Sequence, residues 1–329
     1  MNSHRSRRFV LGALGAALVH PALPVAAQSQ GWPSRPVRIV VPYPAGGSTD
    51  ILARLLGEHL KNEFGQTFVV DNKPGAGTVL GAQLVANSPP DGYTIMMSTV
   101  STLAINPVML KTMPYKAENL VPIALISKAP FVLTASPSFP PNNVKEMLDF
   151  VRARPKEVNL AGQGVGGSSH LVGELLKVSA NLPELAITQY RGSAPANADL
   201  MAGHVQMHFD GINTALPLVL QRRVKALGVT SEVRVPAAPD LPTFVEQGLP
   251  ALVASSWFGL VAPVGTPDEI LDRLNAATNR YIDSTAFKTR ILAEGGIVAG
   301  GSRADFQKFA EAEMAVWRKL VVPLKLELD

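Results

Sequence analysis

Short runs of apolar residues, or of alternating apolar and polar residues, are interspersed with segments of helical periodicity along nearly the whole chain. Runs bounded by Gly, Pro, Asn or Asp predict strands. The predicted strands are 37–43, 67–72, 93–99, 121–135, 158–162, 186–191, 205–210, 224–230, 257–262 and 321–326. The predicted helices are 48–63, 78–87, 144–153, 168–180, 193–202, 214–221, 267–283, 285–294 and 303–319. This alternation predicts an α/β protein with mainly parallel sheets flanked by helices.

Two segments interrupt the alternation and suggest two lobes. The run 121–138 is too long and too apolar for one ordinary strand, and the run 251–267 precedes a long helical tail. We interpret both as crossings between lobes. The predicted lobes are residues 28–129 plus 255–329, and residues 130–254. A ligand would then lie between the strand ends of the two lobes, with the crossing segments as the hinge.

Residues 1–27 have the features of an export signal peptide. A basic start, RSRR, precedes the apolar run FVLGALGAALV and the small residues VAA. The segment SRRFVLG resembles a twin-arginine signal, although its phenylalanine stands one place early, so ordinary Sec export stays open. The apolar run is too short to span a bilayer comfortably, and no later segment reaches about 18 unbroken apolar residues, which argues against a membrane-embedded protein.

Charge and cysteine content exclude several classes of function. The chain has 30 Lys+Arg and 26 Asp+Glu, and three of the arginines lie in the predicted signal, so the remainder is nearly neutral. Its basic residues are scattered, which argues against a nucleic-acid partner or a polybasic membrane surface. The absence of cysteine excludes thiol catalysis and iron–sulfur clusters, and the six dispersed histidines lack a metal-binding spacing. We expect no cofactor and no metal.

The stretch PYPAGGSTD (42–50) forms a predicted strand-to-helix turn. Its glycines allow close backbone approach, and Ser48 or Thr49 can act as N-cap. A helix start presents unpaired N–H groups and a partial positive charge, which suit a carboxylate, phosphate or sulfate. Asp50 would oppose such an anion, so either it turns aside to cap the turn or the ligand also carries an amine or hydroxyl. The alternative is an ordinary turn without a ligand.

A second glycine-rich turn, GQGVGGSSHL, formally matches a dinucleotide-binding fingerprint. The match is weak, because the turn lies mid-chain in an exported protein and no acid ends the following strand near Gln189. It nevertheless predicts another helix N-terminus, with Ser168, Ser169 and His170 in the first turn. A histidine there is otherwise a packing or solvent-facing residue.

Two further turns carry polar candidates. In YRGSAPA, Arg191 can pair with a carboxylate, Gly192 allows close approach and Ser193 can cap the helix, although an exposed arginine needs no ligand. In VQMHFDG, Asp210 ends a strand and can accept from a ligand amine or hydroxyl. It can equally cap the helix 214–221.

Taken in order, PYPAGGSTDILAR, VDNKPGAGTVLGAQLVANSPPDGYTI, STLAINP, GQGVGGSSHL, YRGSAPA and FDG resemble the Bug family. This family comprises periplasmic solute-binding proteins of tripartite tricarboxylate transporters, and the resemblance covers essentially the whole mature chain. It implies a type II periplasmic binding protein fold, with two α/β lobes joined by two crossing strands. The chain departs from the family pattern at Thr78, where a third glycine is usual, and at Leu103, which implies a more apolar distal pocket.

The resemblance implies a receptor in the periplasm of a Gram-negative bacterium, not an enzyme. Its ligand would be a small carboxylate: a dicarboxylate or tricarboxylate, an acidic amino acid, or an aromatic acid or amide. Its partners would be the membrane permease subunits of the transporter, and a monomer suits a receptor that must close freely. The implied ligand-binding positions are Ala45, Gly47, Ser48, Thr49, Asp50, Ser98, Thr99, Ser101, Gly167, Ser168, His170, Arg191, Gly192 and Asp210.

Two other functions compete with this interpretation. An exported serine hydrolase would use Ser168 or Ser48 with His170 and Asp210. Against it, Ser168 and His170 stand two apart in a helical turn and point away from each other, and no G-x-S-x-G elbow is present. A ligand sensor for a signalling system cannot be distinguished from a transport receptor in this sequence.

Overall fold

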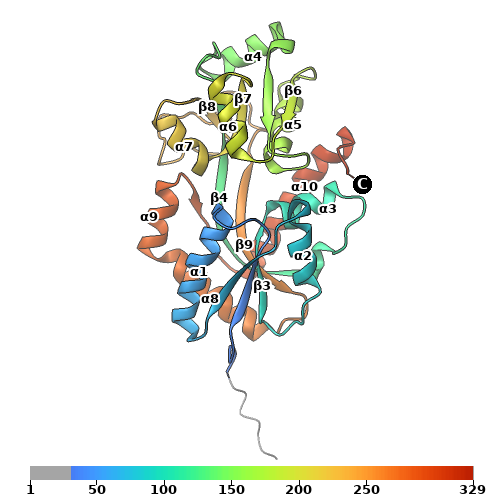
Figure 1. Ribbon diagram of the computed structural model, residues 1–329, viewed down its shortest axis with the longest axis vertical. Coiled ribbons are helices and arrows are strands. Elements are labelled where there is room, and N and C mark those ends of the chain that lie inside the picture. Colours follow the sequence, from blue (N-terminus) through green and yellow to red (C-terminus); the bar gives the residue numbers. More distant parts are fainter. Residues whose placement is uncertain (1–30, 329) are drawn as a thin grey trace, which may run out of the picture. The chain divides into compact units, whose positions relative to one another are not determined.

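The computed structural model describes residues 31–328 (Figure 1). The predicted export signal, residues 1–27, lies outside the described residues. The strands are β1 Val37–Val41, β2 Phe68–Asn72, β3 Thr94–Thr99, β4 Leu120–Ala135, β5 Asn159–Gly162, β6 Ala186–Gln189, β7 Met207–Gly211, β8 Lys225–Val229, β9 Ser255–Pro263 and β10 Ile297–Val298. They join in one sheet in the order β2-β1-β3-β9-β4-β7-β5-β6, with β8 and β10 each paired to β4.

Most of the helices come after a strand in the chain. They are α1 Ser48–Phe64, α2 Val79–Ala86, α3 Asn106–Met109, α4 Val144–Ala153, α5 Ser168–Ser179, α6 Ser193–Ala202, α7 Ile212–Leu220, α8 Asp268–Asp283, α9 Thr285–Ala293 and α10 Arg303–Leu324. Single-turn helices occupy Ala76–Thr78, Ser101–Ile105, Ala117–Asn119 and Pro155–Glu157. None of the helices in the described part of the chain is long and apolar enough to cross a membrane.

The sheet is mixed. β1 pairs in parallel with β2 and β3, and β5 pairs in parallel with β6 and β7, as expected for strands connected through helices. The long strands β4 and β9 pair antiparallel with each other and with their other partners. The predicted α/β class is therefore confirmed, with parallel groups on either side of two antiparallel strands.

Strand β4 changes partner along its length. Its first part, Leu120 to Pro130, pairs with β9, and Phe131 to Ala135 pairs with β7. Pro130 lies opposite Ser255 where the pairing with β9 ends, a place where the missing N–H of proline costs little. The lobe boundaries stay a prediction, and this change of partner is the observation that supports them.

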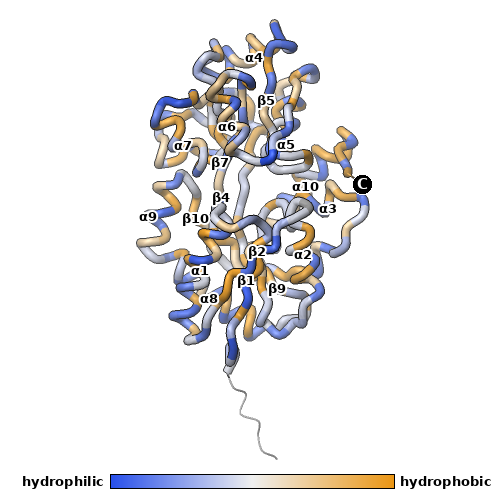
Figure 2. The backbone as a smooth tube through the Cα atoms, in the orientation of Figure 1, coloured by the Kyte–Doolittle hydropathy of each residue, from blue (hydrophilic) through white to orange (hydrophobic). Residues whose placement is uncertain are grey.

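The core lies where the apolar strands meet the helix faces. All six residues of β3 are buried, and α1 turns Leu52, Leu56 and Leu60 inward at helical spacing. Trp257 of β9 packs edge-on against Phe306 of α10, with ring centroids 5.6 Å apart. Figure 2 shows the apolar stretches along the strands near β1 and β9 and hydrophilic stretches on outer segments.

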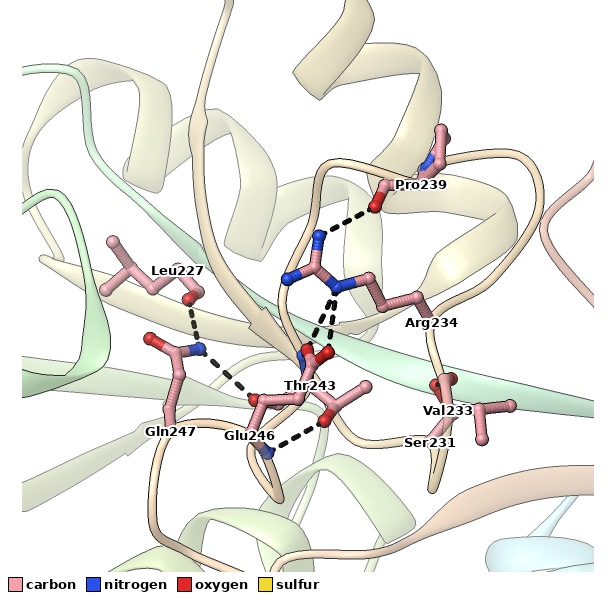
Figure 3. A network of polar contacts seen from close by, with 8 residues as sticks. All are labelled: Leu227, Ser231, Val233, Arg234, Pro239, Thr243, Glu246 and Gln247. Carbon is pink, nitrogen blue, oxygen red and sulfur yellow. Dashed lines mark hydrogen bonds and ion pairs between the residues drawn. The ribbon is translucent and has the colours of Figure 1, made fainter.

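The segment between β8 and β9 has little regular structure and is held by polar contacts (Figure 3). Arg234 donates from Nε to both carboxylate oxygens of Glu246, each at 3.0 Å, and from Nη1 to the carbonyl of Pro239. The Thr243 N–H donates to Glu246, and Gln247 donates to the Leu227 carbonyl of β8. These contacts fix the path by which the chain leaves β8.

The predicted strand 321–326 is wrong. Most of these residues form the end of α10, which continues to Leu324 with Pro323 inside it. Trp317, Leu320 and Val321 are buried on one face of this helix, so packing outweighs the strand preference of adjacent valines. The short strand β10 and the helical segment 101–109 were not predicted.

Candidate functional site

The turn between β1 and α1 leaves a helix start open. Gly46 has φ 87°, Gly47 is the N-cap in extended conformation, and no side chain caps the helix. The prediction that Ser48 or Thr49 is the N-cap is wrong, because the helix already begins at Ser48. The free N–H groups of the first turn and the positive end of a 17-residue helix therefore meet at this turn.

Asp50 faces into the protein and closes the turn from behind. One carboxylate oxygen accepts from the Gly46 N–H at 2.9 Å and from Arg54 Nε at 3.0 Å. The other accepts from Arg54 Nη2 at 2.9 Å and from Asn72 Nδ2 at 3.0 Å. Chiefly through the Arg54 hydrogen bonds, the pKa of Asp50 falls to about 2. Asp50 is thus ionised, and Arg54 balances its charge. Of the two alternatives for Asp50, the structure shows the one in which it turns aside to cap the turn.

The end of β3 lies against the same turn. The Tyr43 hydroxyl is 3.1 Å from Thr99 Oγ1, which ties PYPAGG to β3. Burial raises the pKa of Tyr43, so its hydroxyl stays protonated and can donate. The Ser98 hydroxyl is fully buried and has no hydrogen-bond partner in the described part of the chain. Ser101 begins the single helical turn that follows.

The turn before α5 repeats the geometry of the first one. In VGGSSH, Gly166 has φ 76°, Gly167 is the N-cap and α5 begins at Ser168, again without a side-chain cap. The Gly166 N–H donates to His170 Nδ1 at 3.1 Å, as the Gly46 N–H donates to Asp50. Burial lowers the pKa of His170, which keeps Nδ1 free to accept. His170 therefore holds the second turn from behind.

Asp210 connects the three turns that follow β5, β6 and β7. Its Oδ1 accepts from Gln163 Nε2 at 3.0 Å, from Ser193 Oγ at 2.7 Å and from its neighbour's Gly211 N–H. Its Oδ2 accepts from Asn197 Nδ2 at 2.8 Å. With 1% of its surface exposed, Asp210 braces these turns from inside. It does not cap α7, whose N-cap is Gly211.

His208 completes this cluster and was missed in the sequence. Its ring nitrogens lie 3.1 Å from Gln163 Nε2 and 3.0 Å from Asn197 Oδ1. Residues two apart in a strand lie on the same face, so the prediction of Asp210 as a site residue could have led to His208 as well. Gly192 is the N-cap of α6 in place of the predicted Ser193, and Arg191 is exposed beside it.

The α-helices that start at or next to predicted site residues have the same kind of N-cap. Four helices have a glycine N-cap and no side-chain cap: α1, α5, α6 and α7. By contrast, α4, α9 and α10 are capped by the side chains of Asn143, Ser284 and Ser302. Most of the predicted site residues therefore lie at uncapped, glycine-preceded helix starts, although α2, α3 and α8 also lack a side-chain cap.

A cavity of about 370 Å³ lies beside the start of α1. It reaches the start of α7, where Asn213 Nδ2 donates to Ser48 Oγ at 2.6 Å. Of the predicted site residues, Gly47 and Ser48 line it. His170 and Asp210 do not line it, and they hold the turns of Gly166 and Ser193 instead. Asn213 and Thr214 also line it and were not predicted, although they stand two and three positions after the FDG motif.

Together, the fold and the open helix starts define a two-lobed α/β solute-binding protein. Residues 52–326 match the family model described as tripartite tricarboxylate transporter family receptor, and the chain belongs to this family. It is 35% identical, over 98% of its length and 96% of the relative, to the UPF0065 protein in the tcbD-tcbE intergenic region of Pseudomonas sp. (strain P51). It is 32% identical to Protein BugT of Bordetella pertussis, over 95% of this chain and 96% of BugT.

Solved structures agree with the family. R. palustris Rpa4515 with adipate has a TM-score of 0.81 and 35% identity, covering 88% of this chain and 97% of that one. Periplasmic binding protein BugD has a TM-score of 0.79 and 34% identity, covering 90% and 99%. MatC from Rhodopseudomonas palustris with bound malate has a TM-score of 0.78 and 31% identity, covering 88% and 99%. The resemblance to the Bug family is confirmed, and family and fold are those of solute-binding proteins.

Proposed function

We propose that this protein is a periplasmic receptor that captures a small organic carboxylate between two lobes and delivers it to membrane permease subunits of a tripartite tricarboxylate transporter. The observation that carries the proposal is the uncapped start of α1 backed by a neutralised Asp50. The adipate and malate bound to two relatives support a carboxylate ligand.

The electrostatics of the first turn favour an anion. Without Arg54, the charge of Asp50 would oppose a carboxylate a few ångströms away. Because Arg54 and Asn72 bind both Asp50 oxygens, the positive end of α1 remains the dominant field at the turn. Backbone N–H groups can then bind the carboxylate directly or through water.

The second lobe offers a matching surface. The uncapped start of α5, with Gly167 and Ser168, and the turn carrying Arg191 and Gly192 would approach the ligand as the lobes, residues 28–129 plus 255–329 and 130–254, close. In this proposal Asp50, His170 and Asp210 position the turns and do not touch the ligand. Closure would be driven by the ligand's higher affinity for the closed state.

The geometry disfavours the hydrolase alternative. His170 Nδ1 accepts from the Gly166 N–H, and its Nε2 lies 3.7 Å from Glu174. Both oxygens of Asp210 are bound by other groups. Neither residue is placed to activate Ser168.

The test combines a ligand screen with one charge reversal. A panel of monocarboxylates, dicarboxylates, tricarboxylates, acidic amino acids and aromatic acids is screened by thermal shift, since a ligand at 100 times its Kd adds about 2.7 kcal/mol of stability. Ser48→Asp places a negative charge at the uncapped helix start, and Ser48→Asn is the neutral control of equal size. Both variants keep an acceptor oxygen at position 48 for the Asn213 Nδ2 donor.

We expect Ser48→Asp to be at least as stable as the wild type, because an acid favours the start of a helix. Its affinity for the carboxylate should fall on the order of 100-fold, the effect of about 3 kcal/mol of repulsion at ~5 Å and an effective dielectric constant of ~20. Ser48→Asn should bind nearly as the wild type does. Equal affinity of Ser48→Asp and Ser48→Asn would show that the anion binds elsewhere.

A further inference from the structure

The cavity beside α1 has an apolar body. Six apolar side chains from α1, β4, β9 and α9 line it: Ile51, Leu52, Leu55, Ala129, Phe258 and Ile291. Its volume, about 370 Å³, falls within the range of small-molecule sites, roughly 300–1,000 Å³. At one end lie Gly46, Gly47 and Ser48, the uncapped start of α1.

A buried hydroxyl faces the same cavity. Ser127 of β4 is 3% exposed and is one of the residues that line the cavity. It lies opposite Phe258 in the antiparallel pairing and two positions before Ala129, so all three side chains share one face of the sheet. Phe258 and Ala129 line the cavity, and Ser127 therefore points into it. Its hydroxyl is therefore available to bond a polar atom of the ligand or a water molecule.

The charged side chains at the cavity are already paired. Arg290 Nε lies 3.0 Å from Glu294 Oε1, so this cation is balanced by its neighbour. Lys128 alternates to the other face of β4, where its ammonium lies 4.3 Å from the ring centroid of Phe309. Among the described residues that line the cavity, no further cation is present to receive a second carboxylate.

We propose that the ligand of this receptor is a monocarboxylate with an apolar body, whose carboxylate lies at the start of α1 and whose apolar part fills this cavity. The proposal rests on the carboxylate-receptor function above and narrows its substrate class. A second carboxylate in the cavity would meet neutral polar groups such as Ser127 but no further cation among the described lining residues, so its charge would be poorly compensated. The expected preference therefore differs from that of the adipate-bound relative.

The test uses two acids of equal chain length. Hexanoate and adipate differ in the second carboxylate alone, and benzoate supplies an aromatic body of similar size. Calorimetric titration of the refolded, ligand-free protein should give hexanoate or benzoate an affinity at least ten times that of adipate. Malate, glutamate and citrate complete the panel.

A substitution at the far end of the cavity tests the location. Leu55 is half-buried and lies about 10 Å along α1 from Ser48, at 1.5 Å per residue. Leu55→Lys would supply the missing cation and should reduce the preference for hexanoate over adipate at least fivefold. Leu55→Met keeps an apolar wall and should keep the preference. Val316→Lys adds the same charge at a 47% exposed position of α10, outside the cavity, and should also keep it.

The outcomes separate this inference from the function on which it rests. Adipate, malate or citrate binding as tightly as hexanoate and benzoate would overturn the monocarboxylate assignment and leave the carboxylate receptor intact. Binding of hexanoate with no effect of Leu55→Lys on the ratio would place its apolar body elsewhere and overturn the cavity assignment. A ligand-free, folded protein that binds none of the acids would overturn both proposals.

Discussion

Replacing Asp50 tests whether this residue shapes the anion site from behind. Asp50→Ala removes a carboxylate that is 2% exposed and binds Gly46, Arg54 and Asn72. Because Gly46 is held at φ 87° partly by this contact, its loss should loosen the whole PAGG turn. Asp50→Asn keeps the shape of the side chain and one acceptor oxygen, and is the matched control.

The magnitude follows from the contacts. The Arg54 side chain is 54% exposed, so its ion pair contributes only about 0–1 kcal/mol. The bonds from Gly46 and Asn72 to the charged carboxylate contribute about 1.5 kcal/mol each at the lower end of their range. Asp50→Ala should thus lower the free energy of unfolding by about 3 kcal/mol and Tm by roughly 6–12 °C.

Acid titration isolates the contribution of the charge. The pKa of Asp50 falls from its ordinary value of 3.8 to about 2 in the folded protein. Its stabilisation is therefore complete above pH 3.8 and is lost as the pH falls through about 2. Denaturant unfolding of the wild type and Asp50→Asn should show a difference in stability that shrinks over this interval.

Ligand binding gives the result that would refute this role. If Asp50 acts through the turn, Asp50→Asn should weaken the binding of 2-aminohexanoate and of its amine-free analogue hexanoate by the same factor. A selective loss of 2-aminohexanoate binding would mean that Asp50 contacts the ligand amine. Unchanged stability of Asp50→Ala would show that its four hydrogen bonds do not hold the turn.

Three further predictions concern this turn and the turns held by His170 and Asp210. Because burial lowers the pKa of His170 below 6.5, its contribution to stability should be lost as the pH falls below 6.5, and His170→Gln should flatten this slope in unfolding curves. In Gly46→Ala the new Cβ meets no atom within 4 Å, but the residue is held at φ 87°, so the free energy of unfolding should fall by about 1–2 kcal/mol in chemical denaturation. Gly65→Ala is the control for the same strain away from the site, because Gly65 has φ 70° and equally open surroundings. It should not weaken ligand binding. Asp210→Ala removes the acceptor of Ser193 Oγ and one of the two acceptors of Gln163 and of Asn197, so it should cost about 1–3 kcal/mol. Hydrogen exchange should rise in the turns before α5 and α6 if Asp210 holds them, and unchanged exchange would show that it does not.

The sequence alone determined the elements and the turns. Hydrophobic periodicity predicted nearly every helix and strand, because each depends on the spacing of apolar residues within one segment. It was wrong for 321–326, where the packing of Trp317 and Val321 decided between helix and strand. The positions of the starts of α1 and α5 were also predicted, since glycines before a helix are a local signal, but the cap of α1 was wrongly assigned to Ser48 or Thr49.

Only the tertiary structure decided which groups face a ligand. The sequence left open whether Asp50 turns aside, because its partner Asn72 stands 22 residues away. It gave no sign of the contact between Asn213 and Ser48, which are 165 residues apart, or of Ser127 facing a cavity assembled from α1, α7, α9 and two strands. Local backbone preferences are encoded by neighbouring residues, whereas a site of this kind depends on the relative placement of elements that the folded sheet alone brings together.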